Sequence, residues 1–478
     1  MQNSITSFSE GSHRRGWELN KTKVLVTFAM ILILSISLTY YIVKGTVESG
    51  GTYYLDIPFG DASYYVGKFS NGSTWMVNGD TWQCEAVSTD ASQIINWASG
   101  NLTSGRTWKE KIVVKDDFII TNTVKISSYT ILEIDGKWTL ANGVNKNVIE
   151  NLNLTSGDTS IEIRGGRIDG NGANQNAGSI IYWSGVQDGI IEGMYLESSY
   201  NSIIKIVKPS GVLTETNRIF NNRIRTSTHK HGIEAPYDCS IFSNYIDYNK
   251  EAGIYSFSSL GAGGLLISDN HLWGNLRGIW FKGSNDNSIL ANYIEFNYWE
   301  GIYIESYSTL PSDHQQIIGN CLKQNSREGA NLYNAIYLKG LVTNPIWNII
   351  INDNRIYDAT YHKHAIFGEY VAYATICNNV LQSYSSPIIS GVDGPSSIIK
   401  NNRGFVTENY VSATNTTATT FVFNHGLAGT PDFVCYSFNT TAITGHSWTS
   451  TSTQITVTVT GSGLPEIMAC YCQCVYEP

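Results

Sequence analysis

The sequence predicts an all-β protein whose main part is a solenoid of short parallel strands. Three observations predict this fold: an asparagine that recurs every 22 to 34 residues, short apolar segments broken by Gly and Asn, and a composition poor in charge. The chain has 478 residues, with 44 Gly and 29 Tyr, and only 15% of its residues are charged. Such a composition favours strands and turns over long helices. The formal net charge of −9 argues against a nucleic-acid partner, because phosphate binding needs a basic face.

The recurring asparagine begins a turn motif that is repeated from about residue 216 onward. Its copies read "NNRI", "SNYI", "DNHL", "ANYI", "GNCL", "DNRI", "NNVL" and "NNRG". Repeats of this size are typical of solenoids, and identical amides stacked on adjacent coils can hydrogen-bond along the solenoid axis. The asparagines in question are Asn222, Asn244, Asn270, Asn292, Asn320, Asn354, Asn379 and Asn402.

Two further stretches accompany the asparagine repeat, "GGRIDGNG" at 165–172 and "SSYTILEIDGKWTLANG" at 127–143. With the repeat, they make residues 110–404 resemble the pectin-lyase-like right-handed parallel β-helices. That superfamily includes polygalacturonases, pectate lyases, alginate-modifying enzymes and phage tailspikes. The resemblance implies a right-handed parallel β-helix over about three fifths of the chain. It does not imply one activity, because the superfamily holds hydrolases, lyases, epimerases and proteins that are not enzymes.

An uncharged segment of 20 residues, Val24–Val43, precedes the solenoid and is long enough to span a bilayer as a helix. Lys and Arg gather on its N-terminal side, so the positive-inside rule puts residues 1–23 in the cytoplasm and the rest of the chain outside. A cleaved signal peptide is the alternative. On the outer side lie five Asn-x-Ser/Thr sequons, which are compatible with glycosylation. They begin at Asn71, Asn101, Asn153, Asn415 and Asn439.

The segments on either side of the solenoid are expected to cap it. Residues 46–109 are interpreted as a linker and an N-terminal cap. Residues 405–478 contain no Lys or Arg and are rich in Thr and Ser. They read as antiparallel strands of a small β-sandwich, which would cover the open end of the coils. Outside the membrane disulfides are allowed, and cross-strand disulfides are expected among Cys435, Cys470, Cys472 and Cys474. By contrast, Cys239, Cys321 and Cys377 are expected to be buried thiols in the stack.

One strand per coil follows the turn and begins with an inward isoleucine, as in "AGIYSF", "RGIWFK" and "EGIYIE". The residue after the isoleucine points outward by the alternation of a strand. In five successive coils it is aromatic, and Glu234 occupies the same place one coil earlier. Two positions further on, Lys282, Glu305, Lys339 and Glu369 alternate in charge. The aromatic residues are Tyr255, Trp280, Tyr303, Tyr337 and Phe367, referred to below as the aromatic strip.

Three interpretations of the aromatic strip remain open at this point. Sugar rings stack on aromatic side chains, while flanking charged and amide groups bind hydroxyls and carboxylates, so the strip predicts the binding of an extracellular polysaccharide or glycan. In the superfamily that the chain resembles, this strand lines the substrate cleft. Alternatively, an adhesin, coat or surface-structural protein would dock the strip onto another chain, including a second copy in a homo-oligomer. Finally, stacked aromatics stabilise neighbouring strands without any ligand.

The residues leave the question of catalysis open. Polygalacturonases have an Asp pair followed by a Gly-His-Gly turn; here His231 matches the turn, but Lys230 replaces its first Gly and no Asp pair precedes it. A classical polygalacturonase is therefore disfavoured. A lyase or epimerase needs a base beside a cation, and Arg277, Lys282 and Glu300 lie on adjacent coils. With His231 and Glu305 they form the candidate catalytic set. No cofactor or metal site is predicted.

Overall fold

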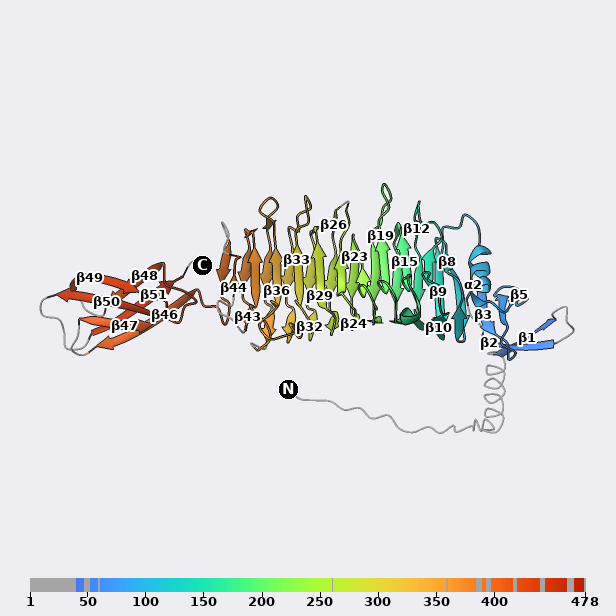
Figure 1. Ribbon diagram of the computed structural model, residues 1–478, viewed down its shortest axis with the longest axis horizontal. Helices are drawn as coiled ribbons and strands as arrows, with labels where there is room; N and C mark the ends of the chain where they lie inside the picture. The colour runs from blue at the N-terminus through green and yellow to red at the C-terminus, as the bar shows by residue number, and fades with distance from the viewer. Residues whose placement is uncertain are drawn as a thin grey trace, which may run out of the picture. The chain divides into compact units, whose positions relative to one another are not determined.

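The fold is described from a computed structural model. The structure describes residues 40–46, 52–58, 61–259, 261–357, 360–383, 389–392, 397–415, 419–438, 443–461 and 468–476. Two compact units are present, one with residues 1–61 and 78–84 and one with residues 62–77 and 85–478. The first contains the antiparallel pair β1 (Tyr40–Thr46) and β2 (Thr52–Pro58). The second contains the solenoid, the capping helix and the C-terminal strands (Figure 1).

The predicted membrane span lies outside the described residues except at its end. Tyr40–Val43 were assigned to that helix but begin strand β1, so the C-terminal boundary of the predicted span is wrong. The described part of the chain contains no helix with the length and hydropathy of a membrane span.

The solenoid is a parallel β-helix, because each coil between Glu110 and Ser390 contributes one strand to each of three long sheets, in which these strands pair in parallel (Figure 1). Sheet 1 has 15 strands, and sheets 2 and 3 have 11 each. In order along sheet 1 the strands are β5 (Cys84–Ser88), β4 (Thr74–Asn78), β3 (Tyr64–Lys68), β6 (Glu110–Lys115), β9 (Thr130–Asp135), β13 (Glu162–Arg164), β17 (Ile190–Glu192), β20 (Asn217–Phe220), β23 (Cys239–Phe242), β27 (Leu266–Ser268), β31 (Ser288–Leu290), β34 (Gln316–Ile318), β38 (Ile350–Asn352), β42 (Thr375–Cys377) and β45 (Ile398–Lys400).

Sheets 2 and 3 follow sheet 1 within each coil. Sheet 2 consists of β7 (Phe118–Ile120), β10 (Lys137–Leu140), β14 (Arg167–Asp169), β18 (Tyr195–Glu197), β21 (Arg223–Arg225), β24 (Tyr245–Asp247), β28 (His271–Trp273), β32 (Tyr293–Glu295), β35 (Cys321–Lys323), β39 (Arg355–Tyr357) and β43 (Val380–Leu381). Sheet 3 consists of β8 (Val124–Ile126), β11 (Ile149–Asn151), β15 (Ile181–Ser184), β19 (Ile204–Val207), β22 (Ile233–Glu234), β25 (Ala252–Ser256), β29 (Arg277–Lys282), β33 (Ile302–Glu305), β36 (Ile336–Lys339), β40 (Ile366–Glu369) and β44 (Ile389–Ser390).

The asparagine ladder predicted from the repeat is present at the turn between sheets 1 and 2. Asn292 shows the pattern: its Nδ2 donates to Oδ1 of Asn320 at 3.0 Å, and its own Oδ1 accepts from Nδ2 of Asn270 at 3.0 Å. The same bond links each pair of neighbours from Asn222 to Asn402. The residue before the ladder position has a positive φ, as at Asn221 (56°) and Gly319 (70°), which gives the turn its sharp bend.

A helix, α2 (Ala91–Gly100), covers the first coils (Figure 1). Its N-cap is Asp90, whose carboxylate accepts the amide hydrogen of Ser92 at 2.9 Å. Ile94, Ile95 and Ala98 are fully buried and join the apolar core that continues through the coils. The helix therefore shields the first strands of the stack from solvent.

The C-terminal residues form two three-stranded antiparallel sheets around an apolar cluster of their own. Their strands are β46 (Glu408–Asn415), β51 (Met468–Val475) and β48 (Phe433–Phe438) in one sheet, and β47 (Thr420–Asn424), β50 (Gln454–Gly461) and β49 (Ile443–Ser450) in the other. The antiparallel strands were predicted from the sequence. A β-sandwich that caps the coils stays a prediction.

The predicted disulfides are absent, because all eight cysteines are free. The register explains why. Cys435 is exposed and lies opposite Gln473, whereas Cys470, Cys472 and Cys474 point to the other face of β51 and are buried in the apolar cluster. The expectation of three buried thiols in the stack holds for Cys239 and Cys377 but not for Cys321, which is half-buried.

Candidate functional site

In the register of sheet 3 the residues of the aromatic strip form one continuous row. Tyr255 pairs with Trp280, Trp280 with Tyr303, and the pairing continues through Tyr337 to Phe367. The isoleucines before them are fully buried in the core. Lys282, Glu305, Lys339 and Glu369 form the neighbouring row, as predicted. Both rows therefore lie on the outward face of sheet 3.

The rings of the aromatic strip touch one another and are less open to solvent than the sequence suggested. Successive ring centroids are 4.8, 6.1, 5.2 and 5.4 Å apart, and the ring planes are tilted by 39° to 58°. Tyr303 is buried, with 6% of its surface exposed, and the other four are half-buried. The strip is thus a packed ladder that shows part of each ring to solvent.

Carboxylates of the charged row hold the polar ends of these rings. Glu305 accepts from Nε1 of Trp280 at 3.1 Å and from the hydroxyl of Tyr303 at 3.0 Å. The hydroxyl of Tyr337 donates to Glu369 at 2.7 Å. Burial, and then these neighbouring carboxylates, raise the pKa of Tyr303 and Tyr337, so both hydroxyls keep their protons and act as donors.

Arg277 and Glu300, two of the candidate catalytic residues, form a buried ion pair. Nε of Arg277 lies 2.8 Å from Oε2 of Glu300, and their side chains are only 13% and 5% exposed. The guanidinium also lies over three rings, with its carbon 4.8 Å from the centroid of Trp280, 4.5 Å from Tyr303 and 4.4 Å from Trp299. Such a cation is fixed in place, and Glu300 is not a free acid or base in this arrangement.

The remaining charged candidates are also engaged. Nζ of Lys282 lies 3.9 Å from Glu305 and 4.3 Å from the ring centroid of Tyr307. Glu305 therefore interacts with one cation and two ring donors at once. The structure thus brings Arg277, Lys282, Glu300 and Glu305 together around Trp280 and Tyr303, with every carboxylate already paired.

His231 lies one coil before the strip and extends it. Its ring stacks on Tyr255 with centroids 4.1 Å apart. Nδ1 accepts the amide hydrogen of Ala252 at 3.1 Å, so the proton of the neutral ring is on Nε2, 3.1 Å from Glu251. Burial, and then the charges of Lys230, Lys205 and Arg277, lower the pKa of His231 to about 3. Glu251 opposes this shift, but a protonated ring would lose the bond from Ala252.

Sequence reasoning missed a ring pair beside the strip. Trp299 and Tyr333 stack with centroids 5.2 Å apart, and Glu328 accepts from Nε1 of Trp299 and from the hydroxyl of Tyr333. Both residues lie in turns that precede strands of sheet 3, and Trp299 lies against the guanidinium of Arg277. Each lies three positions before the inward isoleucine of its coil, Ile302 or Ile336, so the spacing that marks the strip could also have found them.

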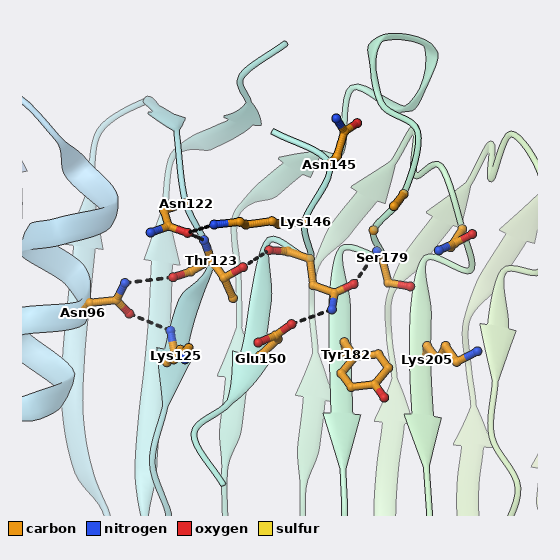
Figure 2. Close-up of a pocket in the computed structure, with 14 residues that line it drawn as sticks. Asn96, Asn122, Thr123, Lys125, Asn145, Lys146, Glu150, Ser179, Tyr182 and Lys205 are labelled. Carbon is orange, nitrogen blue, oxygen red and sulfur yellow. Dashed lines mark hydrogen bonds between the residues drawn. The ribbon is translucent and has the colours of Figure 1, made fainter. Parts of the chain in front are cut away.

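Sequence reasoning also missed the first coils of the same sheet face. The outward row continues upstream of Glu234 through Lys205, Tyr182, Glu150 and Lys125. A cavity of about 790 Å³ opens there, and Figure 2 shows these four side chains across neighbouring strands. The signal was the same inward isoleucine followed by an outward residue, in "SIIYW" and "SIIKI".

Comparisons with known proteins agree with the coil geometry. Residues 256–346 match a family model described as a right handed beta helix region. A comparison with curated protein sequences gives no match.

Three solved structures with similar coils have 12–14% sequence identity to this chain. A mannuronan C-5 epimerase module of Azotobacter vinelandii has 14% identity and a TM-score of 0.48 over 66% of this chain and 95% of its own. The exopolygalacturonase of Thermotoga maritima has 12% identity and a TM-score of 0.49 over 66% and 88%. The Streptococcus pneumoniae surface adhesin PfbA has 14% identity and a TM-score of 0.47 over 65% and 92%.

These three proteins differ in their named roles, and they do not select an activity for this chain. The fold itself rests on the three parallel sheets, the asparagine ladder and the matched region. The chain has the right-handed parallel β-helix fold that its resemblance to the pectin-lyase-like superfamily predicted.

Proposed function

We propose that the protein binds a polysaccharide along the outward face of sheet 3, with sugar rings lying against the aromatic strip. The observation that carries this proposal is the unbroken row of five aromatic side chains on successive coils. A sugar chain offers apolar ring faces at regular intervals, and the partly exposed rings offer matching surfaces. Glu305, Glu369 and Lys339 border the row and supply groups for sugar hydroxyls.

The proposal includes display on the outer side of a membrane, with the uncharged segment that begins at Val24 as the anchor. The cluster of Lys and Arg before the segment supports this orientation. Binding is favoured over cleavage because the candidate catalytic carboxylates, Glu300 and Glu305, are already paired with neighbouring groups. Glu300 is neutralised by Arg277, and Glu305 is held by Lys282, Trp280 and Tyr303.

Binding of the full chain, purified in mild detergent, to a glycan array tests the proposal. Trp280→Ala removes the ring at the centre of the strip and should lower the affinity for bound glycans roughly three- to tenfold, as expected for the loss of an aromatic contact. Tyr337→Ala should have a similar effect. Trp347→Ala is the matched control, because Trp347 is 47% exposed on β37 (Ile346–Trp347), which pairs with β41 (Val371–Ala372) and not with sheet 3.

Two outcomes would contradict the proposal. Unchanged binding by both strip variants would remove the sugar platform, and binding to protein partners alone would leave the adhesin interpretation. Catalysis is a separate arm of the experiment. New reducing ends or unsaturated uronate absorbance, lost in Glu305→Gln, would show that the chain also cleaves its ligand.

A further inference from the structure

The first coils of sheet 3 form a polar groove whose chemistry differs from that of the aromatic strip. It has a volume of about 790 Å³ and is bounded by α2, by the turns that precede β8, β11 and β15, and by the outward side chains of four strands (Figure 2). Three lysines and one glutamate line it, with several amides and Tyr182. We call it the lysine groove, defined by Lys125, Lys146, Lys205, Glu150 and Tyr182.

Positive charge predominates in the lysine groove although the whole chain carries a net charge of −9. Lys125 is exposed and forms no ion pair among the described residues. Lys146 donates to the amide oxygen of Asn122 at 3.0 Å, a neutral partner. Lys205 pairs with Glu234 at 2.9 Å, outside the groove, and Glu234 also accepts from Ser202. An anion in the groove would therefore meet at least two lysines that form no ion pair among the described residues, although Glu150 lies beside Lys125 on the next strand.

The polar walls of the lysine groove are held by bonds to the backbone and to each other. Asn147 donates to Glu150 at 2.6 Å and accepts the amide hydrogen of Ser179 at 2.7 Å. Asn96 of α2 donates to the carbonyl of Thr123 and accepts the amide hydrogen of Lys125 (Figure 2). These bonds fix α2 and the turns around the cavity, so little ordering is needed when a ligand enters.

Tyr182 and Lys205 join the lysine groove to the aromatic strip. The outward row passes from Tyr182 to Lys205, Glu234 and Tyr255 on successive strands. Tyr182 lines the cavity, and burial, then Glu150 and Glu234, raise the pKa of its hydroxyl, so it remains a donor. One extended ligand could thus lie over both regions on a single sheet face.

We propose that the lysine groove binds acidic units of the polysaccharide whose ring faces lie on the aromatic strip, so that the ligand is an anionic polysaccharide. This inference rests on the proposed function. Lys125 and Lys146 bind the acidic groups, while Tyr182, Ser179 and the groove asparagines bind sugar hydroxyls. A charge-assisted bond from lysine to a carboxylate or sulfate is about twice as strong as a neutral one, so charge selects the substrate class.

The experiment compares matched ligands on the full chain in detergent. Uronate, sulfated and sialylated oligosaccharides are each titrated beside their carboxyl-reduced or desulfated forms, which have the same sugar backbone without charge. Lys125→Met and Lys146→Met should each weaken binding of one acidic ligand roughly three- to tenfold, and together more, and leave its uncharged form unaffected. Lys400→Met, on β45 of sheet 1, is the exposed control and should change neither.

The outcomes separate this inference from the function on which it rests. Equal binding of charged and uncharged forms, reduced by Trp280→Ala but not by the lysine variants, would overturn the inference and keep the polysaccharide proposal. Equal binding of poly-glutamate in place of the acidic sugar would show plain attraction of anions and would also overturn it. Binding of neither form by the unaltered chain would contradict both.

Discussion

At the scale of single residues, the most constrained group in the candidate site is Arg277. Its charge is taken up on one side by Glu300 at 2.8 Å and on the other by the faces of Trp280, Trp299 and Tyr303. Both charged side chains are largely removed from water, so each depends on the other. This ion pair connects the turn before the strand to the centre of the aromatic strip, and it positions Trp280 for a ligand.

Neutralising Glu300 should therefore destabilise the protein more than it affects any chemistry. We expect Glu300→Gln to lower the free energy of unfolding by roughly 3 kcal/mol, because Arg277 is left without its carboxylate in a site that excludes water. In the double variant Arg277→Met/Glu300→Gln, at least half of that loss should be recovered. Chemical denaturation followed by tryptophan fluorescence measures both. A fully stable Glu300→Gln protein would instead favour a free, catalytic carboxylate.

His231 makes stability depend on pH. Its pKa in the folded protein is about 3, below the ordinary value of 6.5, so the folded ring stays neutral where the unfolded ring takes up a proton. The contribution of His231 to stability is complete above about pH 6.5 and falls as the pH is lowered toward 3, by about 1.4 kcal/mol per pH unit.

His231→Asn retains an acceptor for the amide of Ala252 but cannot titrate. Between pH 7 and pH 5 the unaltered protein should lose about 2 kcal/mol more than this variant, measured by denaturation at both pH values. If both proteins lost the same unfolding free energy between pH 7 and pH 5, His231 would not be the group that makes stability depend on pH.

At the scale of elements, most of the fold could be predicted from two repeated parts of each coil, the asparagine turn and the strand of sheet 3. The ladder asparagines and the inward isoleucines recur at similar offsets in each coil, so the fold and the register of sheet 3 could be predicted. A second buried amide ladder, at the turn before sheet 3, was within reach of the same reasoning. Its members are Asn249, Asn275, Asn297 and Asn325.

Other features could not be predicted, because they depend on turns of variable length and on side-chain tilt. Within the strip the ring centroids lie 4.8 to 6.1 Å apart, and no sequence pattern predicts these distances. The lysine groove needs α2 and three turns to come together around sheet 3. The expectation of disulfides was wrong because the sequence does not give the register of β48 and β51, which puts Cys435 and Cys472 on opposite faces of their sheet.

The asparagine ladder should be a main source of stability along the coils. Asn292 is 1% exposed, and its side chain accepts twice from Asn270 and donates to Ile267 and to Asn320. We expect Asn292→Ala to lower the free energy of unfolding by roughly 2–4 kcal/mol, because these buried partners lose their bonds. Gln316→Ala is the control, an exposed amide on β34 whose loss should cost less than about 0.5 kcal/mol. Equal effects on the denaturation midpoints would contradict a stabilising role for the ladder.

At the scale of the whole solenoid, sheet 3 presents one outward face with two kinds of chemistry. Its first four strands carry the lysine groove, and its later strands carry the aromatic strip. The row from β8 to β40 contains ten strands, and its nine steps correspond to about 43 Å at ~4.8 Å per step. A solenoid can display such a line because its coils repeat at one spacing, whereas a globular site would close around a short ligand.

The length of this face predicts how affinity should depend on the length of an acidic oligosaccharide. Affinity should rise as the ligand grows and level off only when the ligand spans about 43 Å and reaches both regions. In Lys125→Met/Lys146→Met the rise should end at a shorter ligand, because both groove lysines that bind acidic groups are then lost, and in Trp280→Ala the long ligands should lose the most. Isothermal titration with a size-fractionated series measures both effects. A plateau already reached with a trisaccharide, unchanged in either variant, would mean that the ligand occupies one short site and that sheet 3 does not act as a continuous line.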